Sequence, residues 1–442
     1  MLIIGLSLGL LIVLFLSGVP VAFAFALVVV LMSSILGYDL NFLLPYAFER
    51  MSSMIILSIP LFIIAGLIME RGNITRPLID FVNSVVGRIR GGLGAAGTIA
   101  DAIFGAISGS AAAAIACIGT IMIPRLVEEE GYPRGYASSL MSAAAGIALL
   151  IPPSFSMILY GWITYTSITA CFLAGALPGV LLTTIFITIN WVMVGRYHGV
   201  KKPPAWPGIK QASREIGRTG WRALPALFMP ILILGTIYGG IATPTEAAAV
   251  AVIYAIPVGF LVYRGLTPRN FAAALIEAST NIGAIMVALF FAMILGRMLV
   301  MENVPQAIAT FMTGVTENKY VLLLMVNAFL FLVGMFMDDI TGMIISAPLL
   351  FPIIKEIGIS PVHFAAIITT NLTMGLMTPP MAPLVFLGQM IGKTTFPDMI
   401  KTSMLFVFLG YMPVVLITTY WAPIAEWLPV LALGEKILIP AY

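Results

Sequence analysis

The sequence predicts an all-α polytopic membrane protein built as an inverted repeat, with two re-entrant helical hairpins and two broken transmembrane helices. Three observations predict this class. Of the 442 residues, 60 % are hydrophobic and 9 % are charged; apolar runs of about twenty residues recur along the chain; and a proline pair interrupts two of these runs. A bilayer offers the backbone no water, so spanning segments are helices or a closed barrel. Because the runs lack the alternation of barrel strands, helices are expected.

Ten apolar segments are predicted to span the membrane. No Lys or Arg precedes Arg50, so the first segment is not interpreted as a cleaved signal peptide. The expected spans are residues 1–16, 18–36, 54–70, 135–167, 168–194, 223–241, 246–263, 279–300, 362–390 and 403–425.

The basic residues predict the orientation of these spans. Seventeen of the 22 Lys and Arg residues lie in five loops, which the positive-inside rule places in the cytoplasm, so both termini are expected outside. Two apolar stretches, 92–124 and 320–354, are too broken for simple spans, and each is flanked by loops on one side of the membrane. The first is therefore expected to be a re-entrant hairpin from the inner face, and the second a hairpin from the outer face. The five loops are 71–90, 125–134, 196–222, 264–269 and 393–401.

The two hairpins belong to segments that resemble each other at an offset of 228 residues. Pro124 aligns with Pro352, and the prolines at 133 and 361 also coincide. Each segment runs through a hairpin, a short loop and a span interrupted by a proline pair, at 152–153 and at 379–380. Since the hairpins open to opposite faces, the halves are inverted, which is typical of secondary transporters with binding sites near the midplane.

This pattern divides the chain into four predicted regions. They are residues 1–70, N-terminal spans that form largely scaffold; 71–167, a first repeat with the inward-opening hairpin 92–124 and the broken helix 135–167; 168–278, connecting spans and a cytoplasmic loop; and 279–442, a second repeat with the outward-opening hairpin 320–354, the broken helix 362–390 and a final span.

The proline pairs suggest a reason for the breaks. A proline lacks a backbone donor and disfavours helical geometry at the preceding residue, so two in a row leave several carbonyls without helical partners. A sodium ion coordinated by oxygens would satisfy them. Alternatively, the prolines only kink a span, and neighbouring helices or waters cover the carbonyls.

The hairpin tips contain further oxygen donors. The first tip, 104–114, is a run of small residues with two hydroxyls, at Ser108 and Ser110, although such runs are also typical of tight helix contacts. The second tip, 334–342, contains Asp338 and Asp339, and carboxylates within a membrane usually face a cavity, a partner or an ion. Asp338 aligns with Ser110 and is expected near the ion or as a helix cap. Asp339 is expected to face water or to be protonated.

Other polar residues lie near these segments. Asp101, on the first hairpin arm, suits helix pairing at least as well as function. We expect sodium ligands at the tips and around the breaks, at Ser108, Gly109, Ser110, Gly146, Leu150, Pro152, Met337, Asp338, Gly375, Met377, Thr378 and Pro379. Candidate substrate-binding residues are Arg125, Asn371 and Thr373, although Arg125 is also explained as a cytoplasmic-loop cation. No cluster for a transition metal, no ATP motif and no organic cofactor site is evident in the sequence.

Several motifs, taken in order, resemble one family. These are FGAISGSAAAA (104–114), MIPRLVEEEGYPRGYASSLMSAAAG (122–146) leading to IPPS (151–154), ATPTEAAAVAVIYA (242–255), and GMFMDDITG, APLLFPI, GISPVHFA and GLMTPP (334–380). The chain is similar to the large membrane subunit, the DctM/SiaM type, of tripartite ATP-independent periplasmic (TRAP) transporters.

The resemblance implies sodium-coupled import of an organic acid of the C4-dicarboxylate or sialic acid class. It also implies an ion-transporter-superfamily-like fold of the elevator type, location in the bacterial inner membrane, and two partners. These are a periplasmic substrate-binding protein and a separate small membrane subunit of four spans. In the TPTEAAAV motif, Glu246 is expected to cap the next helix at its N-terminus.

Three other interpretations remain. The nearest is a related sodium/dicarboxylate transporter that needs no binding protein. An intramembrane aspartate enzyme is less favoured because adjacent aspartates diverge on a helix, so no enzymatic activity is expected. A channel suits two occluding hairpins less well than alternating access does.

Overall fold

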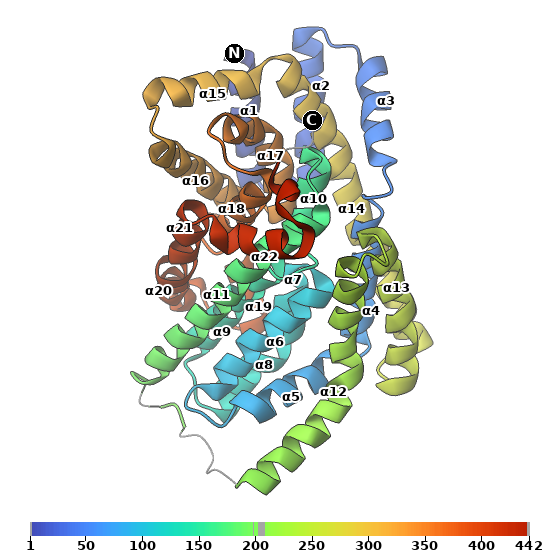
Figure 1. The fold of residues 1–442 in the computed structure, drawn as a ribbon, viewed down its shortest axis with the longest axis vertical. Helices are drawn as coiled ribbons and strands as arrows, with labels where there is room; N and C mark the ends of the chain where they lie inside the picture. Colours follow the sequence, from blue (N-terminus) through green and yellow to red (C-terminus); the bar gives the residue numbers. More distant parts are fainter. Residues whose placement is uncertain (1, 198, 202–207, 440–442) are drawn as a thin grey trace.

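The computed structural model describes residues 2–197, 199–201 and 208–439, and within these ranges the regular structure is helical, with no strand. The molecule is an elongated helical bundle, and its first helix lies toward the upper end, whereas the helix 423–433 lies near mid-height (Figure 1).

The N-terminal part contains five helices: two apolar helices come first, a third follows, and two more lead to the first hairpin. Gly37 ends the second helix in the left-handed conformation, and Asp39 accepts a hydrogen bond from the Asn41 backbone N–H to begin the third. The helices are α1 (Leu2–Leu16), α2 (Val21–Leu36), α3 (Leu40–Met51), α4 (Ser58–Arg71) and α5 (Thr75–Val86).

The region predicted as the first hairpin and first broken helix consists of short helical pieces. The stretch 92–124 holds two antiparallel arms that meet at Gly109, and the next helix stops before the first proline pair and resumes at Phe155. The elements are α6 (Gly92–Ser108), α7 (Ala111–Ala114), η1 (Ile115–Gly119), α8 (Thr120–Pro124), η2 (Arg125–Glu129), α9 (Arg134–Ala145), η3 (Gly146–Leu149), α10 (Phe155–Thr164) and α11 (Ile168–Val194).

Three long helices connect the two regions. Thr243 and Glu246 form a capping box at the start of the second, which confirms the predicted capping role of Glu246. These helices are α12 (Ile209–Tyr238), α13 (Pro244–Pro257), extended by η4 (Val258–Val262), and α14 (Pro268–Met301).

The C-terminal region repeats the pattern of a hairpin followed by an interrupted helix. The arms of the predicted second hairpin join at residues 337–338, and the helix that follows stops at Gly375, before the second proline pair. The elements are α15 (Val304–Val315), α16 (Lys319–Phe336), α17 (Asp339–Glu356), α18 (Pro361–Gly375), α19 (Pro383–Gly392), α20 (Phe396–Phe406), η5 (Val407–Tyr411), α21 (Met412–Tyr420), α22 (Pro423–Leu433) and η6 (Glu435–Leu438).

Seven described helices are long and apolar enough to cross a membrane, judged by length and composition. They include the predicted hairpin arm 319–336 and the helix that runs from 111 to 129. Shorter apolar helices, α1, α2, α10 and α19 among them, make up much of the remaining bundle.

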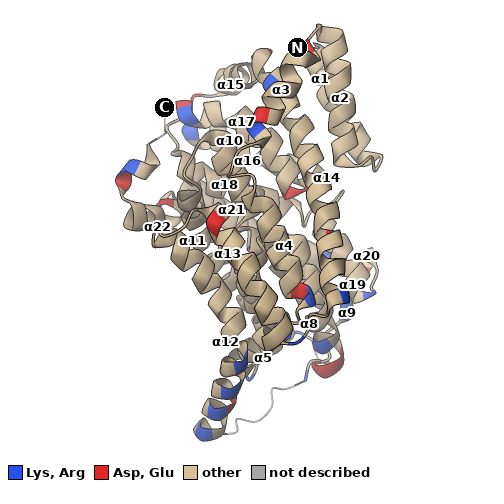
Figure 2. Ribbon diagram, turned by 90° about the vertical axis from the view of Figure 1, so that its right-hand side faces the viewer, with Lys and Arg blue, Asp and Glu red and all other residues tan. Residues whose placement is uncertain are grey.

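Most Lys and Arg residues gather toward the lower end, over α12 and around α8 and α9, as the predicted cytoplasmic loops require (Figure 2).

The structure corrects several predicted boundaries. Residues 40–51, 75–86 and 304–315 were expected in loops but form α3, α5 and α15, because short helices with one polar face lack a continuous apolar run. Two spans also begin earlier than predicted: α12 starts at residue 209 rather than 223, and α14 at 268 rather than 279. Their first turns are polar and so fall outside a hydropathy window.

Small residues allow the two interrupted helices to pack closely. A Cβ atom on Gly388 or Gly392 of α19 would meet the side-chain hydroxyls of Ser142 and Ser138 on α9. Such contacts let backbones approach where lipid supplies no hydrophobic force between helices. The packing holds the first break and the second break in one compact region.

Candidate functional site

The first hairpin tip is a tight turn between α6 and α7. Gly109 ends α6 with a φ of 60°, in the left-handed region, and Ser110 caps α7 by accepting a hydrogen bond from the Ala113 backbone N–H at 3.4 Å. A Cβ atom on Gly109 would lie 2.6 Å from the carbonyl oxygen of Pro153. Glycine is therefore required, because this turn lies directly against the first break.

The first break is a non-helical segment between η3 and α10. The Ile151 N–H still bonds to the Ile147 carbonyl, but the chain then bends through residues 151–153 and is extended at Ser154. The Pro152–Pro153 peptide bond is cis. The Phe155 N–H donates to the Gly109 carbonyl at 3.5 Å, and the hydroxyl oxygen of Ser154 is buried with no hydrogen-bond partner in the described structure. Tip and break thus bring backbone and hydroxyl oxygens together.

The second hairpin tip carries the two aspartates. Asp338 occupies the N-cap position of α17, yet its side chain makes no capping hydrogen bond, and its Oδ1 atom is buried without a partner. Asp339 accepts a hydrogen bond of 2.5 Å from the Ser156 hydroxyl of α10. This bond joins the second tip to the helix that follows the first break.

The second break lies between α18 and α19. The Thr378 N–H donates to the Gly375 carbonyl at 2.8 Å, and the Thr378 hydroxyl donates to the Met374 carbonyl at 2.9 Å. The Pro379–Pro380 peptide bond is also cis. The Met381 N–H donates to the Met335 carbonyl at 3.3 Å, so the second tip and the second break are in contact.

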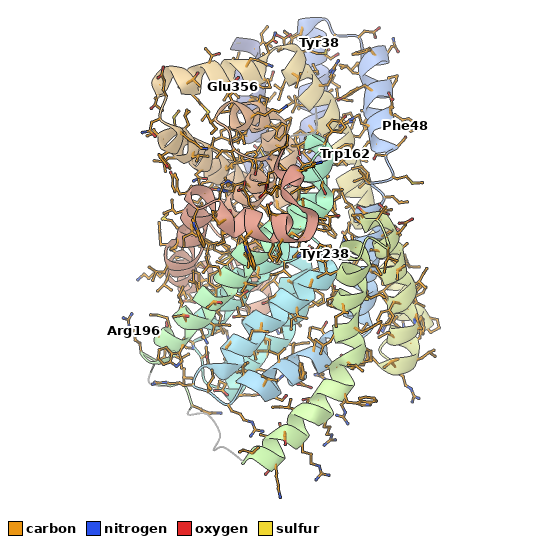
Figure 3. All side chains as sticks on the ribbon, in the orientation of Figure 1. Tyr38, Phe48, Trp162, Arg196, Tyr238 and Glu356 are labelled. Carbon is orange, nitrogen blue, oxygen red and sulfur yellow. The ribbon has the colours of Figure 1, made fainter. Side chains whose placement is uncertain are left out.

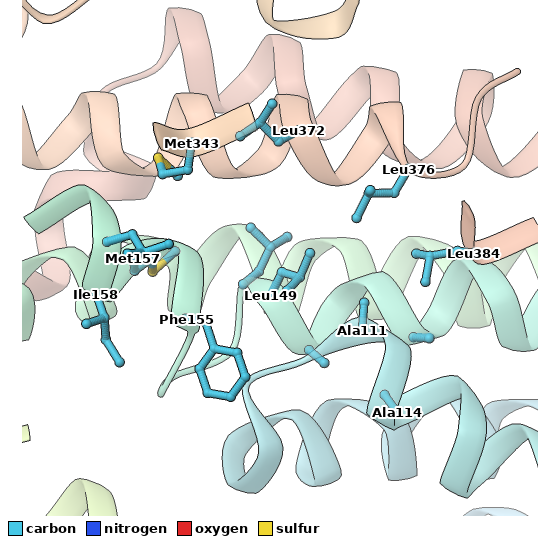
Figure 4. Close-up of a cluster of buried hydrophobic side chains, with 14 of the residues drawn as sticks. Ala111, Ala114, Leu149, Phe155, Met157, Ile158, Met343, Leu372, Leu376 and Leu384 are labelled. Carbon is cyan, nitrogen blue, oxygen red and sulfur yellow. The ribbon is translucent and has the colours of Figure 1, made fainter. Parts of the chain in front are cut away.

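Glycines allow this second contact. A Cβ atom on Gly334 would lie 3.1 Å from the Gly375 Cα atom, and one on Gly375 would collide with the Gly334 backbone. The two breaks and the two tips therefore meet in one region, and an apolar cluster packs among them. Figure 4 shows Ala111, Leu149, Phe155, Leu376 and Leu384 within this cluster.

The predicted substrate residues lie in two different places. Asn371 is buried: its amide donates to the Asn327 side chain at 3.0 Å and to the Ile367 carbonyl at 2.8 Å, while its Oδ1 atom has no partner. Thr373 donates to the Thr369 carbonyl at 2.7 Å. A Cβ atom on Gly146 would lie 2.9 Å from the Thr373 Cγ2 atom, so Thr373 lies against the helical segment that leads into the first break, whereas Asn371 lies against Asn327 of α16.

Arg125 lies apart from the tips. Its guanidinium pairs with Asp80 of α5 at 3.3 Å and with Glu129 at 3.4 Å, and a quarter of the side chain is exposed. The structure thus does not bring Arg125 together with Asn371 and Thr373.

Asp101, on the first hairpin arm, is fully buried, and neither of its carboxylate oxygens has a hydrogen-bond partner among the described residues.

A cavity opens beside the second tip. Its volume is 570 Å³, and it lies between the α1–α2 turn, the second tip and α19. Asp338 and Thr341 are polar residues on a wall that is otherwise mostly apolar.

The donors at the tips and breaks are hydroxyl, carbonyl and carboxylate oxygens, which suit hard cations. In the described part of the chain, no group of three or more His, Cys, Asp and Glu residues could hold a metal ion. Sequence reasoning missed Ser154 and Ser156. Ser154 directly follows the proline pair, and Ser156 lies in the first turn of the helix that begins there.

The chain matches a described protein family over residues 8–423: "Tripartite ATP-independent periplasmic transporter, DctM component". It is 36 % identical over 376 residues to the C4-dicarboxylate TRAP transporter large permease protein DctM of Pseudomonas aeruginosa, covering 83 % of this chain and 86 % of that protein. It is 31 % identical over 383 residues to the sialic acid TRAP transporter large permease protein SiaM of Vibrio cholerae, covering 86 % and 88 %.

A longer relative and a solved structure are also similar. The chain is 34 % identical over 404 residues to the isethionate TRAP transporter permease protein DctMQ of Oleidesulfovibrio alaskensis; the match covers 91 % of this chain but 62 % of that protein's length. The YdaH transporter of Alcanivorax borkumensis has a similar fold, with a TM-score of 0.64 at 16 % identity, over 95 % of this chain and 99 % of that one.

Proposed function

Because the chain belongs to the family of DctM components of tripartite ATP-independent periplasmic transporters, we propose that it imports an organic acid together with sodium ions. Members of this family are membrane transporter components and not enzymes. The observation that carries the proposal is the pair of buried, unpartnered oxygens at the tips and breaks, Asp338 Oδ1 and Ser154 Oγ.

The repeat is supported by the spacing of the helices. α7 begins at Ala111 and α17 at Asp339, α10 begins at Phe155 and α19 at Pro383, and each pair is separated by 228 residues. The helices α5 and α15 precede the two hairpins in the same order. We propose that the hairpins enter from opposite faces, so that the two breaks meet near the membrane midplane.

Two sodium sites follow from this arrangement. The first would use the tip residues Ser108, Gly109 and Ser110 with backbone carbonyls of the first break, from Gly146 to Pro152. The second would use Met337 and Asp338 with carbonyls of the second break, from Gly375 to Pro379. A buried carboxylate oxygen with no partner is costly, and a bound cation would offset that cost.

The organic acid would bind between the two breaks. The N-termini of α10 and α17 lie side by side through the Ser156–Asp339 bond, and helix N-termini favour a negatively charged group. Thr373 lies close to the first break and would contact the acid there, whereas Asn371 would first have to turn from its hydrogen bond with Asn327. Arg125 would reach a substrate only by leaving its ion pairs with Asp80 and Glu129.

The family supports two partners, a small membrane subunit, proposed to have four spans, and a periplasmic protein that delivers the substrate. The relatives differ in the substrate that their names print: C4-dicarboxylate, sialic acid and isethionate. We propose that the complex lies in the bacterial inner membrane. The hairpins and broken helices would then move as one unit against a scaffold that includes the N-terminal spans, which is an elevator mechanism.

The experiment is sodium-dependent uptake by purified variants in proteoliposomes that also contain the small subunit and the binding protein. Ser110→Ala removes a proposed sodium ligand and a helix cap. Its matched control is Ser167→Ala, because Ser167 caps α11 in the same way, by accepting a hydrogen bond from the Ala170 N–H at 3.3 Å. We expect Ser110→Ala to raise the sodium concentration needed for half-maximal uptake, and Ser167→Ala to leave it unchanged.

Two results would count against the proposal. Equal sodium activation in the two serine variants would remove Ser110 from the site. Full uptake without the binding protein would instead favour a transporter that takes its substrate directly from solution.

A further inference from the structure

A second large cavity lies away from the two breaks. Its volume is 970 Å³, at the upper end of the roughly 300–1,000 Å³ typical of small-molecule sites. Its wall comes from the end of α3 and the start of α4, from the end of α10 and the start of α11, and from the start of α13. Figure 3 labels Trp162 at this place on α10, with Phe48 on the neighbouring α3.

Arg50 is the cation of this cavity. Its guanidinium lies over the rings of Trp162 and Tyr165, at 5.1 and 4.9 Å from their centroids, and also donates to the Tyr165 hydroxyl. Its Nε atom is buried with no hydrogen-bond partner among the described residues. A buried donor without a partner indicates that an acceptor is missing from the site.

The surrounding helices add to this positive character. α4, α11 and α13 all begin at the cavity, and Leu57, Ser167 and Thr243, the residues directly before them, line its wall. A helix N-terminus carries a partial positive charge, so the N-termini of α4 and α11 together with Arg50 favour an anion, although Ser167 already accepts the Ala170 N–H of α11. Glu49 and Glu246 also line the cavity, but Glu246 is engaged in the capping box of α13.

Apolar side chains make up much of the rest of the wall, beside the hydroxyl groups of Ser53 and Thr169. Leu57, Leu61, Ile168 and Ala249 lie on it together with the Trp162 ring. A short organic acid or a free phosphate would leave these side chains uncovered, whereas an acyl chain would cover them. The wall therefore suits a molecule with an anionic group at one end and hydrocarbon at the other.

The predicted topology places the cavity at the outer membrane surface. Residues 49–57, 161–169 and 243–249 all lie at the outer ends of expected spans. Trp162 and Tyr165 are the residue types that gather at the level of lipid headgroups. We propose that the cavity holds a phospholipid of the outer leaflet, with its phosphate at Arg50 and its acyl chains against the apolar wall.

The proposal is tested by counting bound lipid. The wild-type chain and its variants are reconstituted in nanodiscs of phosphatidylethanolamine and phosphatidylglycerol and extracted into detergent, and the phospholipids retained per chain are counted by native mass spectrometry. Arg50→Gln should retain the cavity lipid about 10- to 100-fold less tightly, because one charge-assisted hydrogen bond is lost. Lys436→Gln, which removes an exposed cation outside the cavity, should retain it like the wild type.

A second variant separates lipid loss from misfolding. Ala249→Trp fills the apolar part of the cavity and leaves Arg50 in place, and it should also lose the lipid. Equal retention in all four proteins would overturn the proposal. So would stabilisation by free succinate or inorganic phosphate that depends on Arg50 while lipid retention does not, since that result identifies a site for small anions. The lipid count requires neither sodium nor transported substrate, so its failure would leave the proposed transport function untouched.

Discussion

The contact between the first tip and the first break can be tested with two glycine variants that share a backbone conformation. Gly109 and Gly37 both end a helix in the left-handed region, with φ values of 60° and 72°. An alanine in that conformation costs about 1–2 kcal/mol. The two positions differ in their surroundings, because a Cβ atom on Gly109 would lie 2.6 Å from the Pro153 oxygen, whereas one on Gly37 has no atom within 4 Å.

The difference between the variants isolates the contact. Forcing extra volume into a packed site costs about 1–3 kcal/mol, so Gly109→Ala should be less stable than Gly37→Ala by that amount. The assay is the thermal unfolding midpoint of both purified variants in the same detergent, with and without sodium. We expect a lower midpoint for Gly109→Ala and a loss of its stabilisation by sodium. Equal midpoints and equal sodium responses would refute the tip-to-break contact.

Three further variants test other parts of the site. Asp338→Asn should raise the sodium concentration for half-maximal uptake about 10- to 100-fold, because one charged ligand is lost, while the yield of folded protein on size-exclusion chromatography stays the same. Thr243→Ala breaks the capping box and should cost about 1 kcal/mol, lowering the thermal midpoint and leaving sodium activation unchanged. Gly375→Ala would place its Cβ atom against the Gly334 backbone and should cost about 1–3 kcal/mol, read as a lower thermal midpoint; an unchanged midpoint would contradict that close contact.

The positions of the tips and breaks could be predicted because their signals are local. A proline pair stops a helix wherever it lies, and in the structure the helices end before Pro152 and Pro379. Asp338 occupies an N-cap position, as one of its two predicted roles requires, although it makes no capping hydrogen bond. The capping role of Glu246 could likewise be predicted, because the capping box involves only the four consecutive residues 243–246.

The rest depends on contacts between distant segments. Ser156 and Asp339 are 183 residues apart, and no pattern in either segment indicates their hydrogen bond. No pattern in the sequence indicates that the Arg50 guanidinium stacks on the Trp162 ring either. Helix α5 was missed because its apolar residues follow a helical period rather than a continuous run, so it does not resemble a span.

The most direct test of the account is uptake driven by an imposed ion gradient. Proteoliposomes with this chain, its small subunit and a binding protein loaded with its organic acid are diluted into buffer that sets an inward sodium gradient or an equal potassium gradient. The account predicts accumulation of the acid under the sodium gradient and none under potassium. Equal accumulation under both gradients, or with no gradient at all, would contradict the claim that the two breaks form sodium sites.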